Sequence, residues 1–323
     1  MLAFLALVVG LIILGISADR FIEGAAAIAY HSKVSPLVIG MIIVGFGTSA
    51  PEMVVSTLAA LQGHPSLAIG NALGSNIANI GLILGLTAII VPMEVNSNII
   101  RKQLPLLIII SLLMGFIFWD KTLTRPESIG LLLSFILVVI WTIYASLKNK
   151  ADVLAKEVNT ELSLHVMSLK KAILLLLFGL ILLILSSKLV VWGAVHIAKM
   201  FGVSDLIIGL TVLASGTSLP ELAASIIAAR KNEPDMAIGN IIGSNMFNLL
   251  SVIGIAGLIT PITAMPKEIL FRDWPVMMAM TTGLFLMAYG LIGKGRITRW
   301  EGGILLTIFI FYYVFLIRDV VLA

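Results

Sequence analysis

The chain has 323 residues, of which 59% are hydrophobic and only 12% are charged, and its net charge is +4. Together with a mean hydropathy of +1.11, this composition is typical of a helical membrane protein and excludes a water-soluble core. The absence of cysteine excludes disulfides and thiolate metal sites, and the lack of a basic cluster argues against a nucleic-acid partner.

Ten largely apolar segments follow one another, each long enough to cross a bilayer core of roughly 30 Å. In chain order they cover about 2–30, 36–61, 67–91, 104–119, 128–147, 171–200, 205–229, 236–259, 274–291 and 300–321. We therefore predict an all-α polytopic membrane protein with ten transmembrane helices in two five-helix repeats. The repeats are residues 1–147 and 170–323, and a charged, partly helical linker at 148–169 joins them.

An odd number of spans in each repeat means that the second repeat is inverted in the membrane relative to the first. Many secondary transporters have this plan, with the binding site near the middle of the membrane. With the N-terminus outside, the predicted cytoplasmic loops hold thirteen Lys and Arg residues and the outer loops hold six. The positive-inside rule then predicts a cell (inner) membrane protein with both termini outside and the linker in the cytoplasm.

An internal duplication carries the unusual polar residues of the chain. The segment GTSAPE at 47–52 returns 169 positions later as GTSLPE at 216–221. Of the forty positions at 40–79, eighteen are identical to the residue 169 positions further on, among them the GN and GSN motifs at 70–76. The polar positions are the best kept, which indicates a function beyond filling lipid.

Counting residues from each turn predicts which of the repeated polar residues lie at the same depth in the membrane. Glu52 and Ser75 are equally far from the turn at 62–65, and so are Thr48 and Asn79. At 1.5 Å per residue the Glu52 level lies about 17 Å from the turn, close to the membrane midplane. The i, i+4 spacing gives each helix one polar face. The same relations hold in the second repeat for Glu221 with Ser244 and for Thr217 with Asn248.

Pro51 and Pro220 are expected to break the helices that carry them, because proline removes a backbone donor and clashes with the carbonyl four residues back. Carbonyls freed in hydrocarbon need a donor, water or a cation. The candidate carbonyls are those of Gly47, Gly216, Gly45 and Ala214. A site of carboxylates, hydroxyls, amide oxygens and carbonyls suits Ca²⁺, which takes six to eight oxygens at about 2.3 to 2.6 Å.

Charge suggests a mechanism for such a site. Two ionised carboxylates at the midplane cost at least about 2.5 kcal/mol each when the site is empty. One Ca²⁺ neutralises them, and so do two or more Na⁺ ions or protons, so rival ions compete for one carboxylate pair. If the loaded protein changes access and the empty protein does not, the outcome is exchange.

At these residues the sequence resembles the cation/calcium antiporter superfamily, and specifically its prokaryotic sodium/calcium exchanger branch. The resemblance covers the whole chain: ten spans, two inverted repeats, and paired motifs of the types GTSxPE and GNxxGSN. It implies that Glu52 and Glu221 are the central ligands of transported Ca²⁺ and Na⁺, with no cofactor. The further ligands that it implies are oxygens of Thr48, Ser49, Ser75, Thr217, Ser218 and Ser244, and the carbonyls of Gly45 and Ala214 at flanking Na⁺ sites.

At two places the sequence differs from other branches of the superfamily, and these differences favour one branch. Asn79 and Asn248 stand where some relatives carry an acid in the second repeat, which lowers the charge of the site and argues against the potassium-dependent branch. The proton/calcium branch follows its GN motif with an acidic residue, whereas the GN motifs at 70–71 and 239–240 lead to GSN. The sodium-linked branch is the nearer likeness.

The favoured function is therefore Na⁺-driven Ca²⁺ antiport by a monomer in the lipid bilayer. An alternative in the same class is exchange of H⁺ or K⁺ for a divalent cation. An alternative from a different class is a cation channel, because a ring of carboxylates also selects ions. An intramembrane hydrolase is disfavoured, because no His or Lys base occurs at a duplicated position.

The first and sixth spans lack the repeated polar motif, and the resemblance implies that they move over a fixed core to alternate access. Near the predicted cytoplasmic end of the first span lie Asp19, Arg20 and Glu23. These residues suggest either a gate or a self-paired cluster, and we favour the self-paired cluster. Lys188, at the matching place in the sixth span, has no assigned role.

Overall fold

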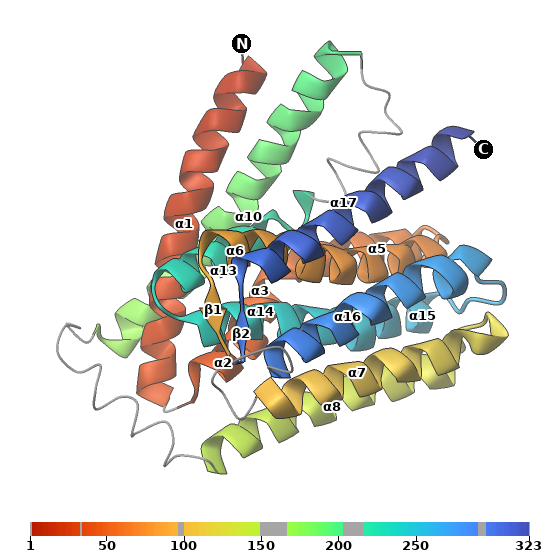
Figure 1. Cartoon of the computed structure of the whole chain (residues 1–323), viewed down its shortest axis with the longest axis horizontal. Coiled ribbons are helices and arrows are strands. Elements are labelled where there is room, and N and C mark those ends of the chain that lie inside the picture. The colour runs from red at the N-terminus through yellow and green to blue at the C-terminus, as the bar shows by residue number, and fades with distance from the viewer. Residues whose placement is uncertain are drawn as a thin grey trace.

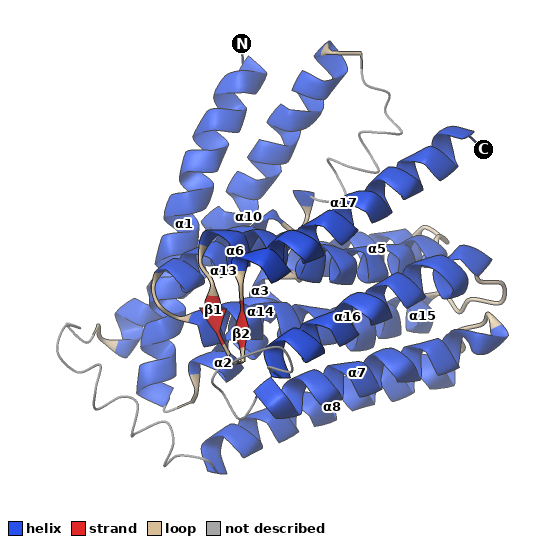
Figure 2. Cartoon of the chain, in the orientation of Figure 1, coloured by secondary structure: helices blue, strands red, loops and turns tan. Residues whose placement is uncertain are grey.

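The computed structural model describes residues 2–32, 34–95, 100–148, 167–202, 216–289 and 295–322. Within these ranges the chain is almost entirely helical (Figure 2). The α-helices are α1 (Leu2–Ser32), α2 (Pro36–Ile39), α3 (Gly45–Thr48), α4 (Ala50–Leu61), α5 (Pro65–Ala78), α6 (Gly85–Ile90), α7 (Ile100–Ile117), α8 (Arg125–Lys148), α10 (Leu169–Met200), α13 (Leu219–Arg230), α14 (Pro234–Phe247), α15 (Ile253–Ile259), α16 (Trp274–Tyr289) and α17 (Arg299–Leu322). π-helical turns span Gly40–Val44, Asn79–Leu84, Asn248–Val252 and Ile269–Asp273, a 3₁₀ turn spans Phe118–Asp120, and the strands are β1 (Met93–Glu94) and β2 (Arg296–Ile297).

The helices confirm a multi-pass membrane architecture. Among the described residues, seven helices are long and apolar enough to cross a membrane, or eight if the bent pair 36–48 and 50–61 is one span. The seventh predicted span is represented by α13, because residues 203–215 lie outside the described ranges, and the ninth is represented by the shorter α16. The count of ten therefore stays a prediction, and most of the predicted linker at 148–169 also lies outside the described residues.

The second span is broken at the predicted place. Its two parts, Pro36–Thr48 and Ala50–Leu61, bend by 47° at Ser49, whose ψ of 4° leaves helical geometry. Ser218 has nearly the same backbone conformation, with φ −90° and ψ 7°, directly before α13. Both breaks precede a helix with proline in its first two positions, where the missing backbone donor costs nothing.

α1 and α10 form an antiparallel pair that runs steeply across the other helices (Figure 1). At 31 residues α1 is about 46 Å long, which exceeds the bilayer core and requires tilt. Gly24 near the end of α1 meets Ala172 near the start of α10, and Gly193 near the end of α10 meets Ala3 near the start of α1. The 169-residue shift converts one contact into the other, as an inverted repeat requires.

Backbone pairing between loops ties the two halves together. Met93 pairs with Ile297 in the β1–β2 ribbon, and Leu123 pairs with Ile262 in an isolated bridge. Ile262 is the repeat counterpart of Met93, so the two pairings are copies of one arrangement. All four side chains are buried, which fixes the loops that connect the outer helices.

Capping boxes fix where the last helix of each half begins. The Thr124 N–H donates to Glu127 Oε2 at 2.8 Å before α8, and the Thr298 N–H donates to Glu301 Oε2 at 2.7 Å before α17. Each glutamate N–H bonds back to the threonine Oγ1, so the first backbone donors of both helices are satisfied.

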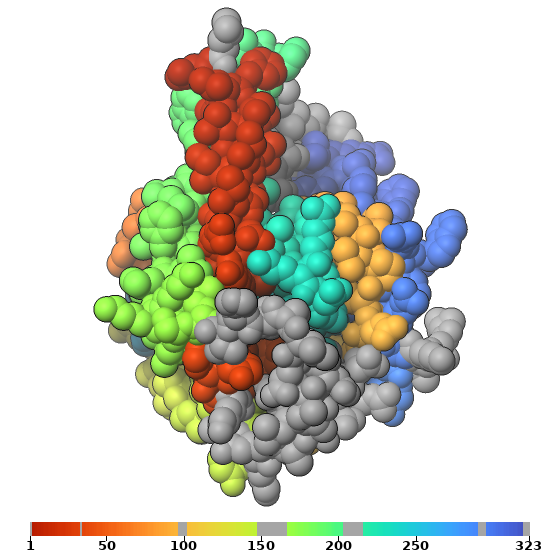
Figure 3. All heavy atoms as spheres, turned by 90° about the vertical axis from the view of Figure 1, so that its left-hand side faces the viewer, coloured from red at the N-terminus to blue at the C-terminus, as the bar shows by residue number. Residues whose placement is uncertain are grey.

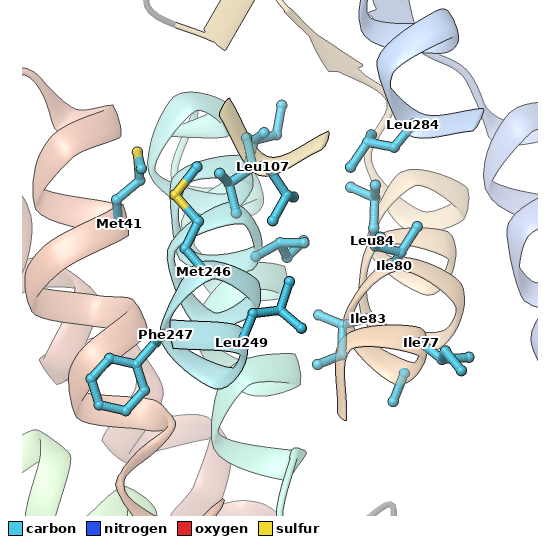
Figure 4. Packing of buried hydrophobic residues seen from close by; sticks show 14 of the residues in the cluster. Met41, Ile77, Ile80, Ile83, Leu84, Leu107, Met246, Phe247, Leu249 and Leu284 are labelled. Carbon is cyan, nitrogen blue, oxygen red and sulfur yellow. The ribbon is translucent and has the colours of Figure 1, made fainter. Parts of the chain in front are cut away.

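The centre of the bundle is made by the two segments that carry the GNxxGSN motifs. Within an 18-residue stretch of each span, 72% of the residues are buried at Pro65–Ile90 and 89% at Pro234–Ile259, against 22% at Arg299–Arg318. Figure 4 shows Ile83 from the first segment and Leu249 from the second pointing toward each other in the core. The polar residues of the GNxxGSN motifs therefore lie on the most buried of these spans.

The α1–α10 crossing leads to a stability prediction. A Cβ atom at Gly24 would lie 2.6 Å from the Leu176 N and 2.7 Å from the Ala172 O, which are backbone atoms that cannot rotate away. We expect Gly24→Ala to lower the free energy of unfolding by about 1 to 3 kcal/mol. Gly15→Ala on the same helix is the control, because nothing lies within 4 Å of its added Cβ. Equal melting temperatures of the two variants in detergent would contradict this packing.

In the turn between α13 and α14, the surroundings of Glu233 disfavour its ionised form. Burial, and then the neighbouring Asp235, raise the pKa of Glu233 from 4.5 to about 7. The folded protein therefore binds this proton more tightly than the unfolded chain does. The free energy of unfolding consequently falls as the pH rises from about 4.5 to about 7.

A pH series of melting temperatures tests this. Glu233→Gln removes the ionisation, so the variant should melt above the wild type at pH 8, and the gap should close toward pH 4.5. Two melting curves that stay parallel across the whole pH range would show that Glu233 has no raised pKa.

Candidate cation-binding site

Each repeated glutamate lies in the first turn of a helix that begins directly after a break. Glu52 follows Pro51 in α4 and Glu221 follows Pro220 in α13. Their exposed fractions are only 1% and 2%. The free N–H groups of a first helical turn carry partial positive charge, which favours a carboxylate there. The proline breaks therefore place both acids at buried helix N-termini.

The two breaks face each other through reciprocal hydrogen bonds. Ser49 Oγ donates to Glu221 Oε1 at 2.9 Å, and Ser218 Oγ donates to Glu52 Oε1 at 3.2 Å. The two carboxylates are also near enough to interact electrostatically. Each half of the chain therefore supplies a serine to the acid of the other half.

Within the described part of the chain, one oxygen of each carboxylate has no hydrogen-bond partner. These atoms are Glu52 Oε2 and Glu221 Oε2, and both are buried. An unpaired charged oxygen in a low-dielectric interior is costly, and such atoms in a folded protein require an explanation. A cation shared by the two oxygens would supply the missing partner.

Two amide side chains present oxygens in the same way. Asn79 Nδ2 donates to Asn245 Oδ1 at 2.9 Å, and Asn248 Nδ2 donates to Asn76 Oδ1 at 3.0 Å. With their amino groups engaged, Asn79 and Asn248 are left with buried, unpartnered Oδ1 atoms. Each of the two begins a π-helical turn, a distortion that is frequent at functional sites. The four asparagines thus form a network between the halves that orients two neutral oxygens.

Further amide–hydroxyl pairs hold the acid-bearing helices in place. Asn71 Nδ2 donates to Ser56 Oγ at 3.0 Å, and Asn240 Nδ2 donates to Ser225 Oγ at 2.9 Å. Asn240 also donates to the Glu221 backbone carbonyl at 3.3 Å. Ser56 and Ser225 were absent from the sequence-based site, although both are identical in the two repeats and lie one helical turn after the glutamates.

The two predicted threonines also lie at this centre. Thr48 Oγ1 donates to Asn240 Oδ1 at 3.2 Å and to Val44 O at 3.0 Å. Thr48 and Thr217 lie beside the carboxylates of Glu221 and Glu52, respectively.

Ser244 Oγ donates to the Gly45 carbonyl at 3.4 Å, and that carbonyl also accepts the Ser49 N–H at 3.0 Å. Ser75 is buried on α5, and Ala214 lies outside the described residues. The Gly216 carbonyl, which the sequence predicted to need a partner, accepts the Ser187 Oγ of α10 at 3.1 Å.

The chemistry of the site is that of oxygen ligands. Among the described residues, no group of three or more His, Cys, Asp or Glu side chains could hold a metal. Among the described residues of the site, the unpartnered side-chain atoms are two carboxylate oxygens, two amide oxygens and one donor, Asn245 Nδ2. Hard cations such as Ca²⁺ and Na⁺ prefer such oxygens, whereas zinc and copper prefer nitrogen and sulfur.

Comparison with known proteins shows the family to which the chain is related. The family model described as sodium/calcium exchanger protein matches residues 2–144 and 171–318. CaxA of Alkalimonas amylolytica is 47% identical over 317 residues, which cover 97% of this chain and 98% of CaxA. The inner membrane protein YrbG of Escherichia coli is 40% identical over 295 residues, covering 90% and 89%. The sodium/calcium exchanger MaX1 of Methanosarcina acetivorans is 30% identical over 349 residues, covering 97% of each protein.

A solved structure gives the same result for the fold. The sodium-calcium exchanger NCX_Mj, soaked with Na⁺ and Ca²⁺, matches with a TM-score of 0.81 and 33% identity, covering 96% of this chain and 97% of that chain. These similarities confirm the resemblance seen in the sequence. They place the chain among membrane transporters, not enzymes.

The amide network predicts a stability effect. Asn76→Leu would remove the acceptor of Asn248 Nδ2, leaving that buried donor without its partner, and would remove one of the donors to the Asn245 carbonyl, which keeps the Asn248 N–H. We expect the free energy of unfolding to fall by about 1 to 3 kcal/mol for the orphaned donor. Gln62→Leu makes the same exchange at an exposed turn and should melt like the wild type. If Asn76→Leu also melts like the wild type, the network does not hold the two halves together.

Proposed function

The chain belongs to the sodium/calcium exchanger protein family, and from that premise we propose that it is a secondary-active antiporter that exchanges Na⁺ for Ca²⁺. The carrying observation is the facing pair Glu52 and Glu221. Each has one oxygen bonded to a serine of the other half and one buried oxygen without a partner. Ca²⁺ and Na⁺ are the proposed cargo, and no resident cofactor is required.

Charge explains why the two cargoes exclude each other. The two carboxylates together carry two negative charges. One Ca²⁺ balances both charges, whereas two or more Na⁺ ions are needed to balance them. Because both kinds of ion need the same unpartnered oxygens, binding of one lowers the occupancy of the other. An empty pair of carboxylates inside the membrane is unfavourable, so the loaded forms are the ones that change access.

Beside the carboxylates, two asparagine side chains are proposed as neutral oxygen ligands. Asn79 and Asn248 offer carbonyl oxygens without adding charge. An aspartate at position 248 would lose the Nδ2 donor that bonds to Asn76, besides adding a negative charge. We therefore assign Asn76 and Asn245 as positioning residues that keep the two amide oxygens directed at the cargo. Thr48, Ser49, Ser75, Thr217, Ser218, Ser244 and the carbonyls of Gly45 and Ala214 complete the proposed ligand set.

Access to the site is proposed to alternate by movement of α1 and α10 across the rest of the bundle. Both helices reach the site region: α1 packs along α13, and Ser187 of α10 bonds to the carbonyl at the second break. The proposed unit is a monomer in the cell inner membrane with both termini outside. Its two inverted repeats, 1–147 and 170–323, flank the cytoplasmic linker 148–169.

Transport in proteoliposomes tests the proposal. An outward-directed Na⁺ gradient should drive ⁴⁵Ca²⁺ uptake, and Glu52→Gln or Glu221→Gln should reduce the uptake rate by at least about tenfold. The reason is that each change removes one of the two charges that balance Ca²⁺, and tenfold corresponds to only about 1.4 kcal/mol. Glu127→Gln, an acid in an exposed capping box, is the control for the loss of one carboxylate.

Three results would contradict parts of the proposal. Full activity of both glutamate variants would remove the proposed site. Uptake that ignores Na⁺ and follows the pH gradient would replace the coupling ion with H⁺. Flux without any counter-ion would indicate a channel.

A further inference from the structure

The two halves of the protein are packed unequally around the site. α1 lies along α13, as Figures 1 and 3 show, whereas α10 makes no comparable contact with α4 among the described residues. The same difference appears at matching positions of the repeat. Ala224 on α13 is fully buried, but its counterpart Val55 on α4 is 42% exposed. The face of α13 is covered, and the equivalent face of α4 is open.

An ion pair joins α1 to the turn after α13 on the covered side. Lys231 Nζ lies 2.9 Å from Asp19 Oδ1, and these residues come from different helices. The sequence favoured a self-paired cluster around Asp19, and this expectation holds for Arg20 with Glu23, which pair at 3.0 Å within α1. It is wrong for Asp19, which pairs with Lys231 in the turn after α13.

The ion pair has no equivalent in the other half. The repeat counterpart of Asp19 is Lys188 on α10, and that of Lys231 is Gln62 at the end of α4. A lysine and a neutral amide cannot form an ion pair, and no ion pair to Lys188 occurs in the part of the chain that the structure describes. The sequence therefore provides an ion pair that can hold α1 against α13 but no matching ion pair that could hold α10 against α4.

We propose that the Asp19–Lys231 pair, named here the gate ion pair, stabilises the arrangement in which α1 covers α13 and the predicted cytoplasmic side is closed. The inference rests on the proposed alternation of access by α1 and α10. It adds that this chain favours one of its two access states through a contact that its inverted repeat lacks.

The strength of the gate ion pair suits a contact that breaks in every transport cycle. Its side chains are 32% and 42% exposed, so water screens the attraction. Exposed pairs of this kind are weak, and the loss of one changes a two-state equilibrium by about two- to fivefold. The gate ion pair therefore biases the two access states without trapping the protein in one of them.

Cysteine labelling can test this directly, because the chain has no cysteine of its own. Single reporters Val55→Cys and Ala224→Cys are made in the full-length protein, and the rate of maleimide labelling is measured in saturating Na⁺. Asp19→Asn should raise labelling of the Ala224→Cys reporter about two- to fivefold and lower that of Val55→Cys. The two reporters move in opposite directions because uncovering α13 accompanies covering of α4.

Three further variants control the experiment. Arg20→Gln removes an ion pair within α1 and should leave both reporters unchanged. The charge swap Asp19→Lys with Lys231→Asp should restore the original labelling rates. Gln62→Glu gives Lys188 a partner on the opposite side and should shift both reporters in the same directions as Asp19→Asn.

The outcomes are decisive in either direction. Opposite shifts with rescue by the charge swap support the gate ion pair. Unchanged labelling after Asp19→Asn overturns it, and so does an equal rise at both reporters, which would mean simple loosening of the fold. Labelling reads helix position, not ion flux, so loss of the proposed exchange activity would leave this test intact.

Discussion

Two buried acids, Glu52 and Glu221, impose the main constraint on this protein. Each is bonded on one side to a serine that belongs to the other half of the chain, and each keeps a second oxygen without a partner. In a membrane interior such a pair is stable only if other charges or dipoles compensate it. Helix N-termini and serine hydroxyls compensate part of the charge, and a bound cation would compensate the rest.

The surrounding architecture follows from that constraint. Proline breaks create the buried N-termini, and π-helical turns re-aim Asn79 and Asn248 on the two most buried spans. The amide network and the loop pairings keep the halves in register, and the α1–α10 pair is bonded to the rest through Asp19 with Lys231 and through Ser187 with the carbonyl at the second break. A bonded centre crossed by a separate helix pair is an arrangement compatible with the proposed alternation of access.

Sequence reasoning reached the local features but not the contacts between halves. The broken helix and its bend could be predicted, because proline chemistry and the duplication are both written in consecutive residues. The depth arithmetic paired residues within one repeat, such as Glu52 with Ser75, whereas the observed bonds of the carboxylates run between repeats. The bonds between repeats depend on how two distant segments pack against each other. The same is true of the Asp19–Lys231 ion pair, because Lys231 lies far from Asp19 in the sequence.

The central claim is that both glutamates share one transported cation. Crystals soaked in Sr²⁺, a heavier analogue of Ca²⁺, test it through anomalous scattering. We expect one strong peak between Glu52 and Glu221, with an oxygen of each within the range of about 2.3 to 2.6 Å expected for Ca²⁺ or slightly beyond it. A map without a peak between them, or with peaks only at surface acids, would contradict it.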